Sequence, residues 1–425
     1  MKVALINLGC KVNRVESDTL LAAFLERGHT TSNLNSADLV LINTCSVTSE
    51  AEKKTRKMVR RALREAPNAR ACVFGCAVAL NPNYYASLDA RVIIEPDKSR
   101  VLDTVLDAIL PDERFDPGFN TTATTSGKEE PNTNASVFVR MGRDFKTRVG
   151  VKIQDGCNNA CTFCIVHVAR GKAWSRPLNQ IEQEVSAYAR LGVKEIVLTG
   201  INIGSYNFEG VTLEMLLERL IALSPEVRFR ISSIEPRDVS EGLIELMKEK
   251  SRHICAHMHL PLQSGSNKVL KAMARPYERE YFLDLCARLY DVLPHMALST
   301  DIIVGFPGET QEDFEETLEV AKQARFVKCH IFPYSLREGT PAAERTDQIE
   351  PALKAQRAAR MRECAQAIRE AEFRKRLGTT EYCLVEDGGK LMTESYFELP
   401  YSGTMPTGSL LECCIEDIPE NWTYI

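Results

Sequence analysis

The strongest constraint on the fold of this chain is a repeated alternation between short apolar segments and amphipathic helical segments. In the first 110 residues the pattern predicts strands at 3–8, 38–43, 71–75 and 91–95 and helices at 16–27, 49–65 and 98–110. Strands that alternate with helices are typical of a parallel sheet with helices on its faces. We therefore expect an N-terminal parallel α/β domain over residues 1–112.

The alternation returns in the central part of the chain. It predicts strands at 148–154, 195–199, 228–232, 256–260, 297–304 and 328–332, separated by helices at 178–191, 213–223, 239–250, 279–292 and 311–324. Thr310 and Asp313 form a predicted N-cap pair for the last of these helices. Six β/α units predict a partial (β/α)6 barrel, short of the eight that close a complete one. With a long charged helix at 351–377, this domain is expected over 141–377.

The remaining segments are a linker and a small C-terminal domain. Residues 113–140 are rich in Pro, Gly, Asn, Thr and Ser, which is typical of an exposed linker. Residues 378–425 contain short strand-like runs separated by glycines, so we expect a small all-β domain there. Three domains fit a chain of 425 residues, since domains average about 150 residues. The fold class is α/β.

The charge of the chain is distributed unevenly. The net charge is −5, but residues 381–425 hold nine acidic residues and one basic residue, so the rest of the chain is slightly basic. Net charge therefore excludes no nucleic-acid role. No apolar run of about 18 residues is present, and no signal-peptide pattern opens the chain, so we expect a cytoplasmic protein without membrane contact. In a reducing cytosol, the 14 cysteines are expected to be metal ligands or buried residues rather than disulfides.

Three cysteines form a local motif with metal-ligand spacing. Cys157, Cys161 and Cys164 follow the first strand of the central domain as Cys-x3-Cys-x2-Cys. Three thiolates can bind a [4Fe–4S] cluster and leave one iron open to chelate a substrate. Zinc normally takes four ligands, for which His167 is the nearest further candidate, and buried thiols are the other alternative. The spacing favours the iron–sulfur cluster.

Three further cysteines are related through the fold rather than through spacing. Cys10, Cys45 and Cys76 each follow the end of a predicted strand. The carboxyl ends of parallel strands share the edge at which ligands bind, so we expect these three to converge. A second cluster is one interpretation, and reactive or buried thiols are the other. Cys72 begins its strand, roughly 13 Å from Cys76 at about 3.3 Å per residue, which favours packing.

These motifs together carry a family resemblance that covers nearly the whole chain. The three-cysteine motif is followed by Arg170–Gly171 and then by LTGINIGSYN, RISSIEP, HMHLPLQSGSNKVLKAMARPY, STDIIVGFPGET and FPYSLREGTP. The N-terminal domain adds LGCKVN, NTCSVT and FGC. The chain resembles the radical S-adenosylmethionine (SAM) methylthiotransferases, and the C-terminal segment lies where that family has its RNA-binding TRAM domain. LGCKVN and NTCSVT are most similar to the branch that acts on N6-threonylcarbamoyladenosine in tRNA.

The resemblance implies an enzyme with two [4Fe–4S] clusters and SAM as cofactors. Cys157, Cys161 and Cys164 would bind the cluster that chelates SAM and cleaves it to a deoxyadenosyl radical, which takes hydrogen from C2 of the adenine. Cys10, Cys45 and Cys76 would hold the second cluster, from which a methylthio group is delivered to that carbon at tRNA position 37. An electron donor and a sulfur source are implied partners, and the oligomeric state is open.

Alternative functions remain at this stage. Sister branches act on isopentenyladenosine in tRNA or on an aspartate of a ribosomal protein. From another class, the chain could be a non-catalytic RNA-binding protein that contains structural metal. The acidic C-terminal segment is unusual for an RNA-binding module, which keeps a basic protein partner open.

Four residues beside the predicted clusters are candidates for contact with SAM. Gly200, Ser232 and Glu235 lie at or just after predicted strand ends, where ligands bind in such sheets. Gly200 would allow close approach of the methionine moiety, and Glu235 could meet ribose or ammonium groups. Phe163, beside Cys164, could pack near the adenine. A turn glycine, a surface carboxylate and a core phenylalanine are the alternatives.

The helix predicted after Cys45 is a candidate RNA-binding surface. It carries seven basic residues within twelve positions: Lys53, Lys54, Arg56, Lys57, Arg60, Arg61 and Arg64. Most runs of charge are solvated faces. The basic residues of this helix are more closely spaced than is usual for a solvated face. Because phosphate contacts supply most nucleic-acid affinity, we expect the helix to face tRNA.

Two histidines of the central domain lie on one side of a predicted strand. His257 and His259 alternate with apolar residues in the segment 256–260, so both point the same way. Metal binding is possible there, but interior histidines with hydrogen-bond partners are favoured. Asp301, in STDIIVG, is a further candidate, and it could equally be a polar residue at the entry of the strand at 297–304.

Overall fold

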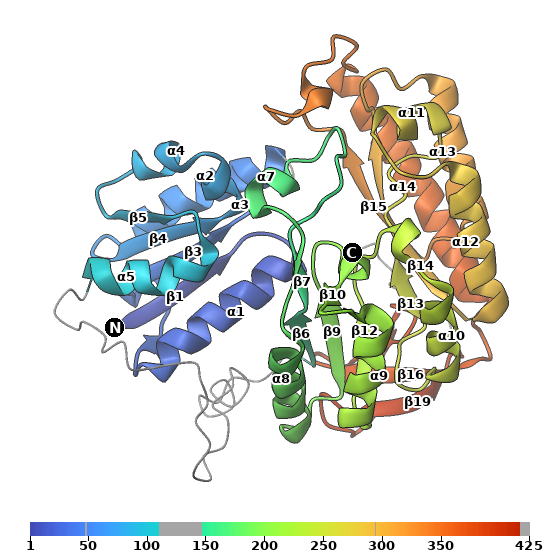
Figure 1. Ribbon diagram of the computed structural model, residues 1–425, viewed down its shortest axis with the longest axis horizontal. Helices are drawn as coiled ribbons and strands as arrows, with labels where there is room; N and C mark the ends of the chain where they lie inside the picture. The colour runs from blue at the N-terminus through green and yellow to red at the C-terminus, as the bar shows by residue number, and fades with distance from the viewer. Residues whose placement is uncertain (47–48, 110–146, 294, 417–425) are drawn as a thin grey trace. The chain divides into compact units, whose positions relative to one another are not determined.

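The computed structural model describes residues 1–46, 49–109, 147–293 and 295–416 (Figure 1). The predicted linker at 113–140 and the end of the chain after 416 lie outside the described residues. The chain divides into two compact units, one of Met1–Asp144 with Val168–Gly171 and one of Phe145–His167 with Lys172–Ile425. The finer division into 1–112, 113–140, 141–377 and 378–425 stays a prediction.

The first unit contains a parallel sheet of five strands in the order β2-β1-β3-β4-β5. The strands are β1 Lys2–Asn7, β2 Thr30–Thr31, β3 Leu39–Thr44, β4 Arg70–Gly75 and β5 Val92–Glu95. The helices are α1 Lys11–Glu26, α2 Ser49–Glu65, α3 Cys76–Leu80, α4 Pro82–Ala86 and α5 Val101–Ile109. Apolar residues of α1 and α5 pack on one face of the sheet and those of α2, α3 and α4 on the other (Figure 1). The central strand β3 is buried along its whole length because both faces are covered.

The second unit is built on six parallel strands. They are β6 Arg148–Lys152, β9 Glu195–Thr199, β12 Arg228–Ile231, β13 His257–His259, β14 Ala297–Val304 and β15 Lys328–Pro333. They form two groups, β6-β9-β12 and β13-β14-β15. Parallel bridges Phe229–Ile254 and Ser233–His259 join the groups. The strands therefore follow one another in sequence order, as expected for a partial barrel.

Helices and short hairpins surround these strands. The helices are α8 Leu178–Arg190, α9 Leu213–Leu223, α10 Glu241–Glu249, α11 Asn267–Ala272, α12 Arg279–Val292, α13 Gln311–Gln323 and α14 Pro351–Arg374. The short helix α7 Val166–Arg170 begins in this unit, and its residues from Val168 on belong to the first unit. The hairpin strands are β7 Gln154–Asp155, β8 Trp174–Ser175, β10 Asn207–Phe208 and β11 Val211–Thr212. Thr310 and Asp313 form a complete capping box at the start of α13, which confirms the predicted N-cap pair.

The C-terminal residues of the second unit form an antiparallel sheet that packs against its barrel. Its strands are β16 Thr380–Glu386, β17 Lys390–Thr393, β18 Glu398–Pro400 and β19 Leu410–Cys414, in the order β18-β17-β16-β19. Phe397 and Ile415 share a buried apolar cluster with Ala297, Val327 and Phe373. Ala297 opens β14 and Val327 precedes β15, so this sheet covers the amino ends of the barrel strands.

The predicted α/β class, with parallel, barrel-like and C-terminal β parts, is confirmed. The prediction of the first helix was wrong at its start, because α1 begins at Lys11 and not at residue 16. Asn13 is buried in the first turn of α1 and makes polar contacts there, so no apolar periodicity marks that turn. The short edge strand β2 and the hairpins of two-residue strands were also not predicted.

Candidate functional site

Cys10, Cys45 and Cys76 follow three neighbouring strands of the first unit. The strands β1, β3 and β4 are adjacent, and they end at Asn7, Thr44 and Gly75. The three cysteines therefore lie at one carboxyl edge of the sheet, and Cys76 is the first residue of α3. Cys10 is exposed, whereas Cys45 and Cys76 are buried. Their role as metal ligands stays a prediction.

A buried amide network holds these loops together. The Asn13 side-chain amide donates to the carbonyls of Leu8 (3.3 Å) and Thr44 (2.9 Å) and to Asn43 Oδ1 (3.2 Å). The Asn43 amide donates in return to the Asn13 carbonyl at 3.0 Å. Buried polar groups with satisfied partners fix local geometry. Asn13 and Asn43 therefore position the cysteine loops, a role that was not predicted although both lie in the motifs LGCKVN and NTCSVT.

Two glycines let these loops approach one another closely. A Cβ on Gly9 would lie 3.0 Å from Cys45 Cβ, and a Cβ on Gly75 would lie 2.5 Å from Asn43 Oδ1. Gly75 also has φ +98°, a backbone conformation that favours glycine. By contrast, Cys72 is fully buried in the apolar core, and burial raises the pKa of its thiol to about 12. The prediction that Cys72 packs is confirmed.

Cys157, Cys161 and Cys164 lie in the loop that follows β6 and β7 in the second unit. Backbone N–H groups donate to two of the sulfurs, Asn159 to Cys157 Sγ and Val166 to Cys164 Sγ, both at 3.4 Å. Burial raises the pKa of Cys157, and it raises the pKa of Cys164 to about 11. Half-buried thiols that receive N–H donors fit a site in which a bound cation holds them as thiolates.

Arg275 links the cysteine loop to the end of a barrel strand. Its guanidinium donates to Cys161 Sγ at 3.2 Å and forms an ion pair with Glu235. Asn159 donates to the other oxygen of Glu235 at 3.3 Å. Burial raises the pKa of Glu235 above its usual range, more than Arg275 lowers it. Arg275 was not predicted, although it lies in the quoted segment KAMARPY, because a single arginine carries no sequence signal of its partners.

The residues predicted to contact SAM differ from one another in their packing and in their hydrogen bonds. Gly200 packs against Gln154, since a Cβ there would lie 2.9 Å from two oxygens of that residue. Ser232 is buried, and its hydroxyl has no hydrogen-bond partner among the described residues. Phe163 packs beside a buried apolar cluster that includes Met273 and Phe306. Contact of these residues and Glu235 with SAM stays a prediction, which the unpartnered Ser232 hydroxyl supports most directly.

Gln154 fixes the loop that carries the metal motif. Its side chain is buried and donates to the carbonyls of Asp155 and Gly156, both at 2.9 Å. Its oxygen accepts from the backbone N–H groups of Ile201 and Asn202 at 3.0 Å. The start of the cysteine loop is thereby tied to the end of β9.

His257 and His259 face the same side of β13, as predicted. His257 Nε2 and His259 Nδ1 lie 3.0 and 2.9 Å from the hydroxyl of Ser299 on β14. The interior, hydrogen-bonded interpretation is therefore confirmed for this pair. His259 also forms an ion pair with Asp301, 3.4 Å between Nε2 and Oδ2.

The predicted RNA-binding helix is α2. Thr55, Val59 and Ala62 are buried on one of its faces, whereas six of its seven basic residues are exposed: Lys53, Lys54, Lys57, Arg60, Arg61 and Arg64. The seventh, Arg56, is half-buried and pairs with Glu52, and Arg61 pairs with Glu65 at 2.8 Å. The exposed face remains strongly basic. Binding of RNA there stays a prediction.

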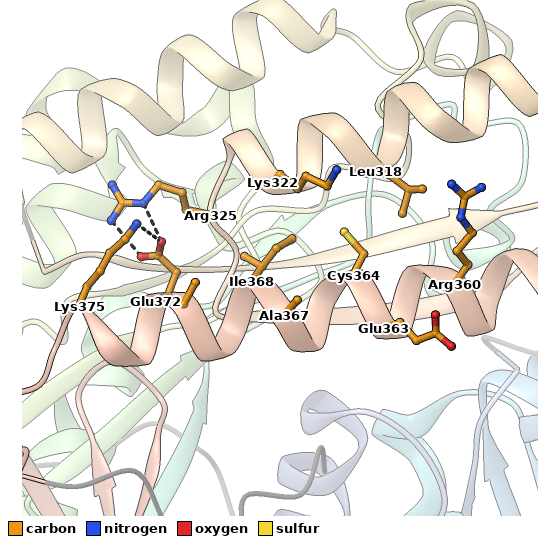
Figure 2. Close-up of a pocket in the computed structure, with 11 residues that line it drawn as sticks. Leu318, Lys322, Arg325, Arg360, Glu363, Cys364, Ala367, Ile368, Glu372 and Lys375 are labelled. Carbon is orange, nitrogen blue, oxygen red and sulfur yellow. Dashed lines mark hydrogen bonds and ion pairs between the residues drawn. The ribbon is translucent and has the colours of Figure 1, made fainter.

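A groove between α13 and α14 is a separate feature of the second unit (Figure 2). Its floor is apolar, with Leu318 and Ile368, and none of the predicted site residues lines it. Arg325 and Lys375 both pair with Glu372 along its rim. The charges of Arg325, Glu372 and Lys375 are therefore paired within the chain. No helix in the described part of the chain is long and apolar enough to cross a membrane.

Comparisons with known proteins connect both units to characterised enzymes. Residues 151–321 match the Radical SAM superfamily, and residues 2–94 match Uncharacterized protein family UPF0004. Threonylcarbamoyladenosine tRNA methylthiotransferase MtaB of Bacillus subtilis (strain 168) is 38% identical, over 84% of this chain and 79% of that protein. The protein of the same name from Chlamydia pneumoniae is 35% identical, over 98% and 96% of the two chains.

A relative that is named for another substrate is also similar to this chain, and so is one solved structure. A tRNA-2-methylthio-N(6)-dimethylallyladenosine synthase of Methylacidiphilum infernorum (isolate V4) is 36% identical, over 90% of this chain and 83% of that protein. The radical SAM methyltransferase TsrM from Kitasatospora setae, solved with cobalamin and a [4Fe–4S] cluster, has a TM-score of 0.56 at 15% identity. That match covers 81% of this chain and 77% of TsrM, and it supports the fold alone.

Proposed function

Because the chain belongs to the family of radical SAM tRNA methylthiotransferases, we propose that it transfers a methylthio group to C2 of N6-threonylcarbamoyladenosine beside the tRNA anticodon. The observation that carries the proposal is similarity, over 84–98% of this chain, to relatives named for that reaction. The arrangement of cysteines supports it, since each unit carries three of them in loops at the carboxyl edge of a parallel sheet.

Enzymes of this family use SAM and two [4Fe–4S] clusters. Cys157, Cys161 and Cys164 would hold one cluster, and Cys10, Cys45 and Cys76 the other. When bound, these groups supply the one-electron cleavage of SAM and the sulfur that is transferred. An adenine C2–H is too inert for acid–base chemistry, so the contribution of the chain is to bind, orient and exclude water.

In the second unit, individual side chains position the cysteine loop and the groups around it. Arg275 holds Cys161 and Glu235 in a fixed relation, and Gln154 fixes the entry of the cysteine loop. Backbone N–H groups directed at sulfur favour the thiolate form of the ligands. We assign SAM contact to Phe163, Gly200, Ser232 and Glu235, with the buried Ser232 hydroxyl as a donor to the bound cofactor.

The proposed partners are tRNA, an electron donor and a sulfur source, in the cytoplasm. The exposed cations of α2 would contact RNA phosphates. Reversing two of them in Arg60→Glu/Arg61→Glu should weaken tRNA binding and flatten its dependence on salt, because fewer counterions are released. Arg219→Glu/Lys248→Glu, on exposed positions of α9 and α10, is the matched control. Equal effects of the two pairs would place the RNA surface elsewhere.

The substrate is tested on tRNA nucleosides by mass spectrometry. Cells that lack this chain and any redundant enzyme should lose 2-methylthio-N6-threonylcarbamoyladenosine, and the wild-type chain should restore it. Complementation by Cys157→Ala should fail, whereas Cys286→Ala, at a buried cysteine of α12, should restore the nucleoside. An unchanged pool would reject the proposed substrate. Loss of the dimethylallyl nucleoside instead would assign the other branch.

A further inference from the structure

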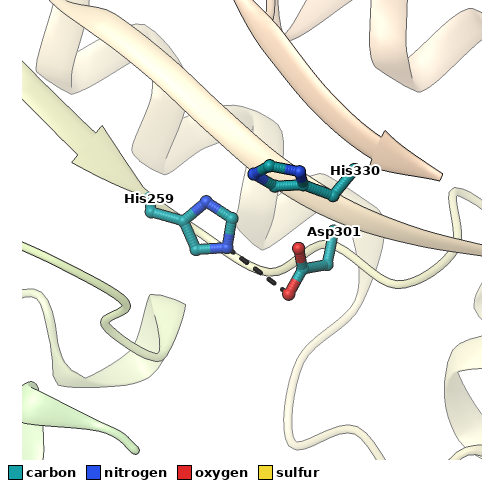
Figure 3. Close-up of side chains that lie close together, drawn as sticks. All are labelled: His259, Asp301 and His330. Carbon is teal, nitrogen blue, oxygen red and sulfur yellow. Dashed lines mark ion pairs between the residues drawn. The ribbon is translucent and has the colours of Figure 1, made fainter. Parts of the chain in front are cut away.

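Three polar side chains from neighbouring strands of the second unit converge on one point (Figure 3). His259 ends β13, Asp301 lies in the middle of β14, and His330 is its register partner on β15. One ligand-type atom from each of the three lies within 4.8 Å of the other two. No sequence motif joins these residues, which are 42 and 29 positions apart.

This cluster faces the concave interior of the barrel. The alternate residues Met258, Leu298, Ile302 and Cys329 are buried at 0–3% exposure, as expected for the side that the helices cover. The Tyr396 ring contacts cationic groups of β6, β12 and β15, namely Arg148, Arg230 and Lys328. Side chains from strands that are not neighbours can contact the same Tyr396 ring only if they lie on the concave side of the barrel. On β15, Lys328 and His330 share that side.

The cluster also lies near the cysteine loop. His259 pairs with Ser233, the residue between Ser232 and the segment that leads to Glu235. It is therefore level with the carboxyl ends of the strands. The interior is open here, since the side chains of Asp301 and His259 keep 31% and 15% of their surface exposed. His330 is exposed as well.

The hydrogen bonds define which atoms can receive a ligand. His259 Nδ1 is engaged with the Ser299 hydroxyl, and Nε2 faces Oδ2 of Asp301. A proton on Nε2 satisfies that contact, and His259 then orients the Asp301 carboxylate. Burial acts to raise the pKa of Asp301, but its interactions with His259, His330 and Arg275 hold that pKa below its usual range. The cluster thus presents a carboxylate acceptor beside the His330 imidazole, a potential donor.

We propose that His259, Asp301 and His330 bind the threonylcarbamoyl substituent of the substrate adenine, an inference that rests on the proposed function. That substituent carries urea N–H donors, a hydroxyl and a carboxylate. Asp301 accepts from the N–H or hydroxyl groups, and His330 donates to the carboxylate. C2 and C6, the atom that bears N6 and its substituent, are atoms of the same six-membered ring, so we infer that a barrel that presents C2 to the reacting centre also encloses the substituent.

The cluster discriminates against the apolar dimethylallyl group of the related substrate. Such a group makes no hydrogen bonds, so Asp301 and His330 would lose water without gaining partners. Sites built for polar groups reject apolar analogues strongly for this reason. A divalent metal is the other ligand that two histidines and an aspartate suit. We favour the substrate because Nδ1 and Nε2 of His259 already have partners in Ser299 and Asp301, which a hydrogen-bonding ligand would leave in place.

The test compares anticodon stem–loop RNAs that differ only in the adenine substituent. Affinity and kcat/KM are measured for reconstituted wild type, Asp301→Asn, His330→Ala and the control His295→Ala, an exposed histidine before the amino end of β14. For the threonylcarbamoyl RNA, Asp301→Asn and His330→Ala should each lower affinity and kcat/KM by about 10- to 100-fold, the range for one charge-assisted hydrogen bond. The dimethylallyl RNA should lose much less, so the ratio of the two affinities should fall. His295→Ala should change neither.

The other outcomes separate the possibilities. A ratio that stays constant in the variants, including equal losses on both RNAs, would overturn the inference while the proposed function stands. A transition metal beyond the cluster iron that wild type holds and His330→Ala lacks would assign the cluster to a metal. Absence of any product from the threonylcarbamoyl RNA with the wild-type chain would overturn the proposed function and this inference together.

Discussion

The two ends of the barrel in the second unit differ in whether their buried charged groups are paired within the chain. At the amino end, Glu195 is fully buried between Arg228 and Arg230, with its oxygens 2.5 and 2.7 Å from their nitrogens. The same arginines donate to backbone carbonyls of the C-terminal sheet, those of Tyr382 at 2.8 Å and Glu394 at 2.7 Å. Glu195, Arg228 and Arg230 thus have their partners inside the chain, so this group of charges is structural.

At the carboxyl end, the chain itself supplies only some of the hydrogen-bond and ion-pair partners of the polar side chains. Arg275 divides its donors between Glu235 and the sulfur of Cys161, the Ser232 hydroxyl is buried without a partner among the described residues, and Asp301 remains partly exposed. Buried polar groups that lack partners in the protein point to a ligand. The contrast with the ion pairs of Glu195 supports the proposal that the chemistry takes place at the carboxyl end of these strands.

The comparison also explains the acidic C-terminal segment. Glu386 pairs with Arg148 at 2.9 Å, and Glu381 pairs with Arg376 at 3.3 Å and accepts from Ser395. These carboxylates neutralise arginines at the amino end of the barrel instead of facing solvent. Part of the charge that is unusual for an RNA-binding module is therefore internal.

The largest expected effect is at the carboxyl end, from Cys157→Ala. This change should abolish 5′-deoxyadenosine formation from SAM, because one ligand of the proposed cluster is lost. Reconstituted wild type should contain about eight irons per chain and the variant about four. Cys255→Ala, at a buried cysteine near the amino end, should keep both iron and activity. Deoxyadenosine formed by Cys157→Ala would show that this end does not carry the radical chemistry.

The next effect is on stability at the amino end, from Glu195→Ala. The substitution leaves two buried guanidinium groups without their carboxylate and should lower the free energy of unfolding by about 3–5 kcal/mol. Denaturant unfolding measures the change, with Glu218→Ala on the exposed face of α9 as the control. Should Glu195→Ala fail to fold, Glu195→Gln provides a milder version. An unfolding curve like that of the control would refute the structural role.

A smaller effect is expected for Arg275→Gln at the carboxyl end. Glu235 loses its ion pair and Cys161 loses a donor, so the iron of the motif should be held less firmly. Iron release to a chelator should accelerate severalfold, and the KM for SAM should rise. Arg275→Lys, which keeps the charge but not the fork of donors, should lie between wild type and Arg275→Gln. Identical release rates for all three would exclude this positioning role.

The smallest effect is a difference in pH dependence between the two ends. Burial acts to raise the pKa of Glu195, but Arg230 and Arg228 hold it well below its usual range, whereas burial raises the pKa of Glu235. The contribution of Glu195 to the free energy of unfolding is fully present above about pH 4.3, the pKa of a glutamate in the unfolded chain. It is lost progressively as the pH falls from there toward the lowered pKa of the folded state. Glu235 behaves oppositely, and stability rises as pH falls through its raised pKa.

Unfolding free energies between pH 8 and pH 3 measure both trends. The advantage of wild type over Glu195→Gln should shrink toward the acid end, while its advantage over Glu235→Gln should grow as pH falls toward about 4.3. Parallel curves for the two variants would mean that the two carboxylates do not differ in this way.

The features of the fold and of the site that can be predicted from the sequence are those that a single segment of the chain encodes. The bounds of α2, α9, α12, β9 and β14 follow from periodicity, and the capping box of α13 follows from Thr310 and Asp313. The placement of Cys10, Cys45 and Cys76 on neighbouring strands follows from their positions after strand ends, given parallel topology. Local pattern and tertiary structure agree at these places.

The unpredicted residues depend on contacts between distant segments. Arg275 meets a sulfur 114 positions away, and the neutralisation of Arg230 comes from Glu195, 35 positions away, and from the C-terminal sheet. The cluster of His259, Asp301 and His330 needs the register of three strands before its members can meet. No periodicity or spacing within one segment encodes such meetings.

The most direct test of the central claim is a hydrogen-transfer experiment with the reconstituted chain. The substrate is tRNA that carries N6-threonylcarbamoyladenosine with deuterium at C2, incubated with SAM, reductant and a sulfur source. Mass spectrometry should find deuterium in the 5′-deoxyadenosine and the 2-methylthio nucleoside in the tRNA, in comparable amounts. Deoxyadenosine without deuterium, or a tRNA that gains no methylthio group, would contradict the assignment of radical chemistry at C2.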